Sequence, residues 1–84
     1  INEINKDSRF NIFPNPTKNE INIELQNDIK GKVVITNQLG QFVKELKIND
    51  NKLIVNVEEL SPGIYYLNIF NKREKVLSEK IVVE

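Results

Sequence analysis

The sequence predicts an all-β fold, namely an immunoglobulin-like antiparallel β-sandwich of about seven strands. Three observations support this prediction. Apolar residues recur with a period of two along most of the 84 residues. No stretch keeps the apolar spacing of a helix for more than about two turns. Turn-forming residues recur at intervals of about 8 to 12 residues, the spacing of a small sandwich. A chain of this length builds a single core.

The first two strands lie on either side of a proline-rich segment, FPNPT at residues 13–17. Because Pro14 and Pro16 fix φ and lack an amide donor, this segment must turn the chain or end an edge strand. Apolar residues alternate before and after it: Phe10, Ile12, Ile21, Ile23 and Leu25. Five more strands are expected, at 32–37, 41–48, 52–57, 64–70 and 75–83.

Turn signals separate these strands, at 27–32, 37–41, 49–51, 58–63 and 71–74. The first two have Asn or Asp at the start and a glycine three or four positions later. That pattern is typical of hairpins whose type I turn ends in a left-handed glycine, here Gly31 and Gly40. Pro62 and Gly63 are expected at the centre of a type II turn, because proline presets the first φ and glycine accepts a positive second one.

Side-chain alternation predicts which residues face the core. Phe42, Leu46 and Ile48 share one face of their strand, and Val43 breaks this phase, which indicates a β-bulge. The strand at 64–70 is apolar on both faces and is expected to be central. We expect most of the aromatic side chains to pack in the core and not to form a ligand platform: Phe10, Phe13, Phe42, Tyr65, Tyr66 and Phe70.

The composition excludes most catalytic chemistry. Without histidine or cysteine, the chain has no Ser-His-Asp or Cys-His pair, no imidazole base and no Cys/His zinc site. Glu58 and Glu59 are the candidate carboxylate pair for glycoside hydrolysis, but adjacent strand residues point to opposite faces, which favours a solvated turn. Asp50 suits a calcium loop, yet a calcium shell needs more carboxylates than this hairpin supplies. We therefore expect no enzymatic activity, no metal and no cofactor.

Net charge and hydropathy limit the possible partners. The formal net charge is zero, so no basic field favours nucleic acid. No apolar run approaches the length of a membrane span, so we expect no membrane insertion. The chain contains no methionine, which favours a piece of a longer protein. We expect residues 1–8, INEINKDS, to end a linker from an upstream domain, and residues 9–84 to form the domain.

Four segments in order resemble one known family. FNIFPNPTKNEINI (10–23), VVITNQLGQFV (33–43), ELSPGIYYLNI (59–69) and KIVVE (80–84) are similar to the C-terminal sorting domain, type A, of type IX secretion system cargo proteins. Each segment is weak evidence alone, and the four in order are specific. The residues that match the family's motifs are Pro14, Asn15, Pro16, Gly40, Gly63, Tyr65, Lys80, Ile81 and Val82.

The resemblance implies a removable address on a secreted enzyme or adhesin of a Gram-negative bacterium. Such a domain folds in the periplasm and engages a shuttle protein and the outer-membrane translocon. A sortase-like protease then cuts at or before residues 1–8, and the cargo stays at the cell surface or enters the medium. The resemblance thus implies a domain that binds and does not catalyse.

Two alternatives remain open, since a fold does not determine function. One is a carbohydrate-binding or adhesive module, and the other is a structural accessory domain packed on a catalytic neighbour. The last strand raises a separate expectation. With Ile81 and Val83 facing the core, an edge position would leave the backbone of residues 80–84 free to pair with a receptor strand, and Lys80 would fix the register.

Overall fold

The computed structural model describes residues 10–26 and 29–84, which form seven strands and no helix. None of these residues therefore belongs to a helix that could cross a membrane. The expected linker, residues 1–8, lies outside the described part. The strands are β1 (Phe10–Phe13), β2 (Glu20–Leu25), β3 (Gly31–Asn37), β4 (Phe42–Lys47), β5 (Lys52–Asn56), β6 (Gly63–Asn71) and β7 (Glu74–Val83).

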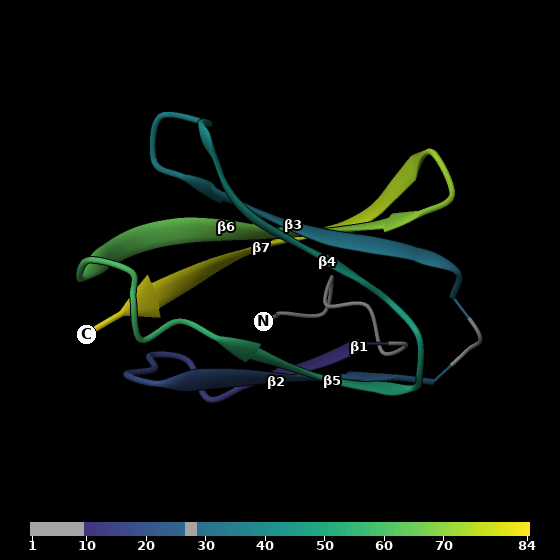
Figure 1. Ribbon diagram of the computed structural model, residues 1–84, viewed down its shortest axis with the longest axis horizontal. Helices are drawn as coiled ribbons and strands as arrows, with labels where there is room; N and C mark the ends of the chain where they lie inside the picture. The colour runs from purple at the N-terminus through teal and green to yellow at the C-terminus, as the bar shows by residue number, and fades with distance from the viewer. Residues whose placement is uncertain (1–9, 27–28) are drawn as a thin grey trace, which may run out of the picture.

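The strands form two sheets that lie face to face (Figure 1). The three-stranded sheet has the order β1-β2-β5 and the four-stranded sheet the order β4-β3-β6-β7. Every pairing between strands is antiparallel. The chain passes from one sheet to the other after β2, β4 and β5, as in immunoglobulin-like sandwiches. The predicted fold class is confirmed, and so is the central position of β6.

The core lies between the sheets and follows the predicted alternation. In the middle of each central strand every second residue is buried between the sheets, and burying one large apolar side chain stabilises the fold by about 1.5 to 3 kcal/mol. The fully buried residues are Ile21, Ile23, Val33, Ile35, Val55, Val57, Leu67, Ile69 and Ile81. The intervening residues of each strand therefore form the two outer faces of the sandwich.

The predicted bulge in β4 is confirmed, but its effect on Phe42 was not foreseen. The pairing between β3 and β4 shifts after Ile35, and Val43 is the extra residue. Leu46 packs against the core and Ile48 is buried, as expected. An extra residue reverses the alternation beyond it. Phe42 therefore lies on the outer face, 64% exposed, and its predicted core position is wrong.

The expectation that most aromatic side chains pack in the core is also wrong. Phe10 and Tyr65 are buried. The period of two that buries Tyr65 turns the next residue of β6 outward, and β1 likewise presents its last residue to solvent. Four rings consequently lie on outer faces, exposed or half-buried: Phe13, Phe42, Tyr66 and Phe70.

The structure requires glycine at positions 40 and 31 for different reasons. Gly40 closes the β3–β4 hairpin with a φ of 84°, as predicted. The predicted hairpin at 27–32 is wrong, because β2 and β3 belong to different sheets, although residues 27 and 28 themselves lie outside the described part. Gly31 does not have a positive φ. A Cβ there would overlap the carbonyl oxygen of Phe70, so the close approach of β6 requires glycine.

The connection from β5 to β6 also differs from the prediction. Its turn hydrogen bond runs from the Leu60 amide to the Val57 carbonyl oxygen, 3.0 Å, upstream of Pro62. Gly63 has a φ of 156°, whereas the corresponding glycine of a type II turn has a φ of about 80°. The type II assignment is therefore wrong, but Gly63 still has a backbone conformation that other residues rarely adopt.

Candidate functional site

The four segments that carry the resemblance meet at one end of the sandwich. Gly63 pairs with Val83 across β6 and β7, and Tyr65 pairs with Asn37 of β3 and with Ile81 of β7. In Figure 1 this end is on the left, beside the C label. We call it the motif end and define it as residues 14–19, 37–41, 58–63 and 80–84. Segments far apart in the sequence thus form one surface.

The Pro-Asn-Pro segment is bonded to the end of β7. The Asn15 side-chain amide donates to the carbonyl oxygen of Lys80, 2.9 Å, and its Oδ1 accepts from the amide of Val82, 3.0 Å. The Thr17 amide donates to the Val82 carbonyl oxygen, 2.9 Å, and the Thr17 carbonyl oxygen accepts from the Glu84 amide, 2.8 Å. The first motif of the sequence therefore binds the last one.

This contact overturns the expectation of a free backbone at residues 80–84. β7 is the last strand of its sheet, but Thr17 forms a parallel bridge beside Val83 and the Asn15 side chain takes the place of a backbone partner. Thr17 is buried, and its hydroxyl donates to the Glu20 carbonyl oxygen, 2.6 Å. The prolines remove two amide donors, and Asn15 and Thr17 supply the bonds that prolines cannot make.

The second motif, in the β3–β4 hairpin, and the third motif, in the β5–β6 connection, also lie next to each other. Asn37 Oδ1 accepts from the amides of Leu39 and Gln41, both 2.9 Å, and this bonding shapes the hairpin around Gly40. Leu39 at the tip is 83% exposed. A cavity of about 270 Å³ separates the hairpin from the β5–β6 connection, and its lining residues are Asn37, Gln38, Leu39, Pro62, Gly63, Ile64 and Tyr65.

Tyr65 connects the core to the motif end. Its ring is buried among the core residues, and its hydroxyl donates to the carbonyl oxygen of Ser61, 2.7 Å. A tyrosine hydroxyl bonded to the backbone a few residues upstream, at the corner where the chain changes sheets, is the tyrosine corner of immunoglobulin-like sandwiches. This bond fixes the start of β6 against the preceding connection.

The motif residues divide by accessibility. Tyr65 and Ile81 are buried and Val82 is half-buried on the outer face. The other six are exposed: Pro14, Asn15, Pro16, Gly40, Gly63 and Lys80. Lys80 lies opposite Tyr66 in the pairing of β6 and β7, so it points to the outer face of the four-stranded sheet. A partner approaching the folded domain can touch these six residues.

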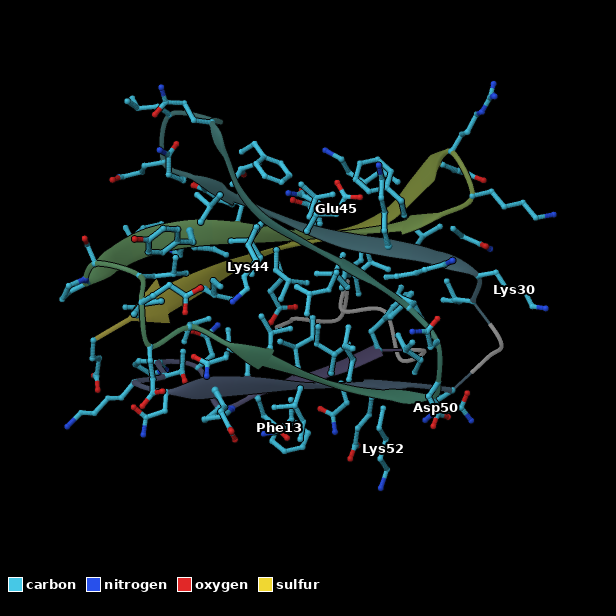
Figure 2. All side chains as sticks on the ribbon, in the orientation of Figure 1. Phe13, Lys30, Lys44, Glu45, Asp50 and Lys52 are labelled. Carbon is cyan, nitrogen blue, oxygen red and sulfur yellow. The ribbon has the colours of Figure 1, made fainter. Side chains whose placement is uncertain are left out.

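Lys44 joins the two sheets at the β4 and β5 edges, a link that the sequence analysis missed. Its Nζ donates to the Asn56 carbonyl oxygen, 2.7 Å, and to Glu59 Oε2, 2.7 Å, and Figure 2 shows it between the sheets. The hydrogen bond from Lys44, with one from the backbone of Glu59 itself, lowers the pKa of the Glu59 carboxyl. Of the candidate carboxylate pair, Glu59 thus bonds to Lys44, while the Glu58 amide donates to Asn56 Oδ1, 2.8 Å.

Asp50, the candidate calcium ligand, has a local bonding role. Its Oδ1 accepts from the amide of Asn51, 2.7 Å, within the β4–β5 connection. Within residues 10–26 and 29–84, no three acidic residues come together as a possible metal site. The structure therefore brings the family's motif residues together at one end, and it holds Glu59 and Asp50 in local structural bonds.

Comparison with known proteins identifies the family. Residues 11–84 match the secretion system C-terminal sorting domain. Over 73 residues the chain is 34% identical to the ulvan lyase NLR42 of Nonlabens ulvanivorans. This match covers 86% of this chain and 14% of the length of that protein. Over 67 residues the chain is 25% identical to beta-agarase A of Zobellia galactanivorans, covering 79% of this chain and 12% of that protein. The chain therefore belongs to the family of secretion system C-terminal sorting domains.

Proposed function

We propose that this domain directs an attached cargo protein across the bacterial outer membrane through the type IX secretion system. Residues 9–84 act as the address, and residues 1–8 connect it to the cargo. A shuttle protein and the translocon bind the domain after it folds in the periplasm, and a sortase-like protease removes it at the cell surface. Both relatives are named as enzymes, which supports an enzyme as the cargo. The domain itself has no catalytic part in this scheme.

The contact between Asn15 and the backbone of Lys80 and Val82 is the observation that carries the proposal. These bonds join Asn15 to residues that lie 65 and 67 positions later in the sequence. The family's first and last motifs therefore form one surface only in the folded domain. The second and third motifs border one cavity at the same end. This arrangement supports recognition of a folded end of the sandwich and not of a linear tail.

Accessibility suggests a division of labour among the motif residues. Tyr65 and Ile81 are buried, so they act through the stability of the fold. Pro14, Pro16 and Lys80 are exposed at the motif end, and they are the residues that we propose the secretion machinery reads. A side chain that is read must be accessible, and its replacement must weaken export without weakening the fold.

A reporter fusion tests the proposed function. A signal peptide and a reporter protein are placed before residues 1–84, and a second fusion ends at the reporter. In a host with type IX secretion, we expect only the first reporter to reach the surface or the medium. If the two reporters are found in the same compartment, the domain is not an export signal.

A pair of charge reversals on β7 tests which residues are read. Lys80→Glu and Lys75→Glu both change an exposed side chain on the outer face, and such changes alter stability by no more than about 0.5 kcal/mol. Lys80→Glu also leaves the Lys80 carbonyl oxygen free to accept from Asn15. We expect fusions with Lys80→Glu to accumulate in the periplasm and those with Lys75→Glu to be exported. Equal export of the two folded variants would show that Lys80 is not read.

A further inference from the structure

Three aromatic rings lie on the outer face of the four-stranded sheet. Residues of β6 alternate between core and outer face, and Tyr66 and Phe70 point outward, half-buried. Phe42, opposite Thr36 of β3, is 64% exposed on the same face. None of the three lines the cavity beside the β3–β4 hairpin. The rings therefore lie on the outer surface of the sheet and not between the two sheets.

The same outer face is strongly basic, although the whole chain is neutral. The strand pairings place four lysines and one glutamate on it, a net charge of +3: Lys32, Lys47, Lys75, Lys80 and Glu45. The outer face of the three-stranded sheet carries one lysine and two glutamates, a net charge of −1: Lys52, Glu20 and Glu24. Glu45 and Lys52 are labelled on these opposite sides in Figure 2. The two faces of the sandwich thus differ in sign.

Lysines stand next to the rings of β6. Tyr66 lies opposite Lys80 on β7. Phe70 lies opposite Lys32 on β3 and Lys75 on β7, and Lys32 Nζ is 5.9 Å from the centre of the Phe70 ring. Each of these rings therefore has a cation next to it, and the cation over Phe70 is Lys32, whose Nζ also lies 3.9 Å from Glu45 Oε1.

We propose that this face binds a linear polysaccharide that carries carboxylate groups. The sugar rings stack on the aromatic side chains, and the carboxylates pair with the neighbouring lysines. The spacing suits an extended polymer, because four residues along β6 separate Tyr66 from Phe70 by about 13 Å, and two strand spacings separate Phe42 from Tyr66 by about 10 Å. A single small sugar cannot cover rings so far apart.

Two other occupants fit the face less well. The cores of protein interfaces are depleted in lysine, and this face has four. Single-stranded nucleic acids also stack on aromatic residues, but the proteins that bind them offer a basic groove, and this face is open. The proposed function carries the domain to the cell surface, where it meets polysaccharides before the protease removes it.

The test measures binding of the purified 84-residue chain by calorimetry. The probe is polygalacturonate, and its methyl ester provides the same sugar chain without the charges. Polyglutamate is a polyanion without sugar rings, and oligothymidylate represents single-stranded nucleic acid. We expect saturable binding of polygalacturonate that weakens at high salt, and at least about tenfold weaker binding of the other three polymers, the loss typical of a missing binding hot spot. Equal or tighter binding of any of the three would overturn the proposal.

Matched variants locate the site. Phe42→Ser and Lys75→Glu change exposed residues of the basic face, and Phe13→Ser and Lys52→Glu change exposed residues of the opposite face. We expect the first two to weaken polygalacturonate binding by about tenfold, as loss of a central contact does, and the last two to leave it unchanged. The reverse pattern, or equal effects on both faces, would overturn the assignment. The measurement involves no export, so its result is independent of the sorting role.

Discussion

Asn15 and Val82 lie 67 residues apart in the sequence, yet the Asn15 side-chain oxygen accepts a 3.0 Å hydrogen bond from the Val82 amide while its amide group donates to Lys80. A side chain with both a donor and an acceptor can replace a strand's backbone in this way. The Pro-Asn-Pro segment, which lacks two amide donors, thereby covers the end of β7. An asparagine between two prolines is thus an attachment point for the last strand.

Asn15→Asp should weaken this attachment. The carboxylate still accepts from the Val82 amide but cannot donate to the Lys80 carbonyl oxygen. We therefore expect the free energy of unfolding to fall by about 1 kcal/mol, the net contribution of one hydrogen bond. Thermal unfolding measures the change. Asn49→Asp is the control, since Asn49 is exposed in the β4–β5 connection and its side chain makes no hydrogen bond within the described residues. Equal melting temperatures for the two variants would contradict the role of Asn15.

Tyr65→Phe should destabilise the domain by about 1 kcal/mol or somewhat more, because the bond to Ser61 is lost and its carbonyl oxygen is left without that donor. The buried ring and its packing are retained. Tyr66→Phe is the matched control, since Tyr66 lies on the outer face and its hydroxyl has no hydrogen bond within the described residues. Urea unfolding of both variants gives the comparison, and a larger loss for Tyr66→Phe would refute the tyrosine corner.

Gly40→Ala should cost about 1 to 2 kcal/mol, the penalty of a left-handed backbone for a residue with a Cβ. A Cβ at this position meets no other atom within 4 Å, so the penalty comes from the backbone alone. Gly40→Asn should cost less, because asparagine tolerates this conformation. Denaturant midpoints of the two variants test the explanation. If asparagine is no better than alanine, the φ of 84° is not what selects glycine.

The ion pair between Lys44 and Glu59 predicts a pH dependence. Its hydrogen bond lowers the pKa of Glu59 in the folded state, so the ionised carboxylate stabilises the fold at neutral pH. This contribution is lost as the pH falls below the ordinary value of 4.5 and through the lowered pKa. We expect Glu59→Gln to melt below the wild type at neutral pH and to converge with it in acid. Glu58→Gln should not show this convergence, since within the described residues no ion pair or hydrogen bond joins Glu58 to Lys44.

Local patterns predicted the parts of the fold that depend on neighbouring residues. The alternation of Ile21 and Ile23 placed β2 correctly, because burial of one face sets the period of a strand. The left-handed Gly40 followed from a hairpin that is closed by residues within five positions. The sequence showed the bulge at Val43 as a break in the alternation of apolar residues. Which residues beside the bulge face the core depends on the pairing with β3, which the sequence does not show. The prediction therefore placed Phe42 on the wrong face.

Contacts between distant segments could not be predicted. Gly31 is required by the approach of the Phe70 carbonyl, and the sequence offers no sign of that approach. The bonds from Asn15 to β7 depend on how two edges of different sheets meet. The resemblance identified Asn15 and Lys80 as motif residues, and the structure joins the Asn15 side chain to the backbone of residues 80 and 82, which explains Asn15 but not the choice of lysine at position 80.

The location of a fused reporter in two hosts tests the central proposal most directly. The hosts are identical except that one lacks the type IX translocon, and the fusion carries a signal peptide, the reporter and residues 1–84. Protease added to intact cells, together with assay of the medium, measures the exported fraction. We predict that the reporter is exported in the first host and retained in the periplasm of the second. The same distribution in both hosts would contradict the account.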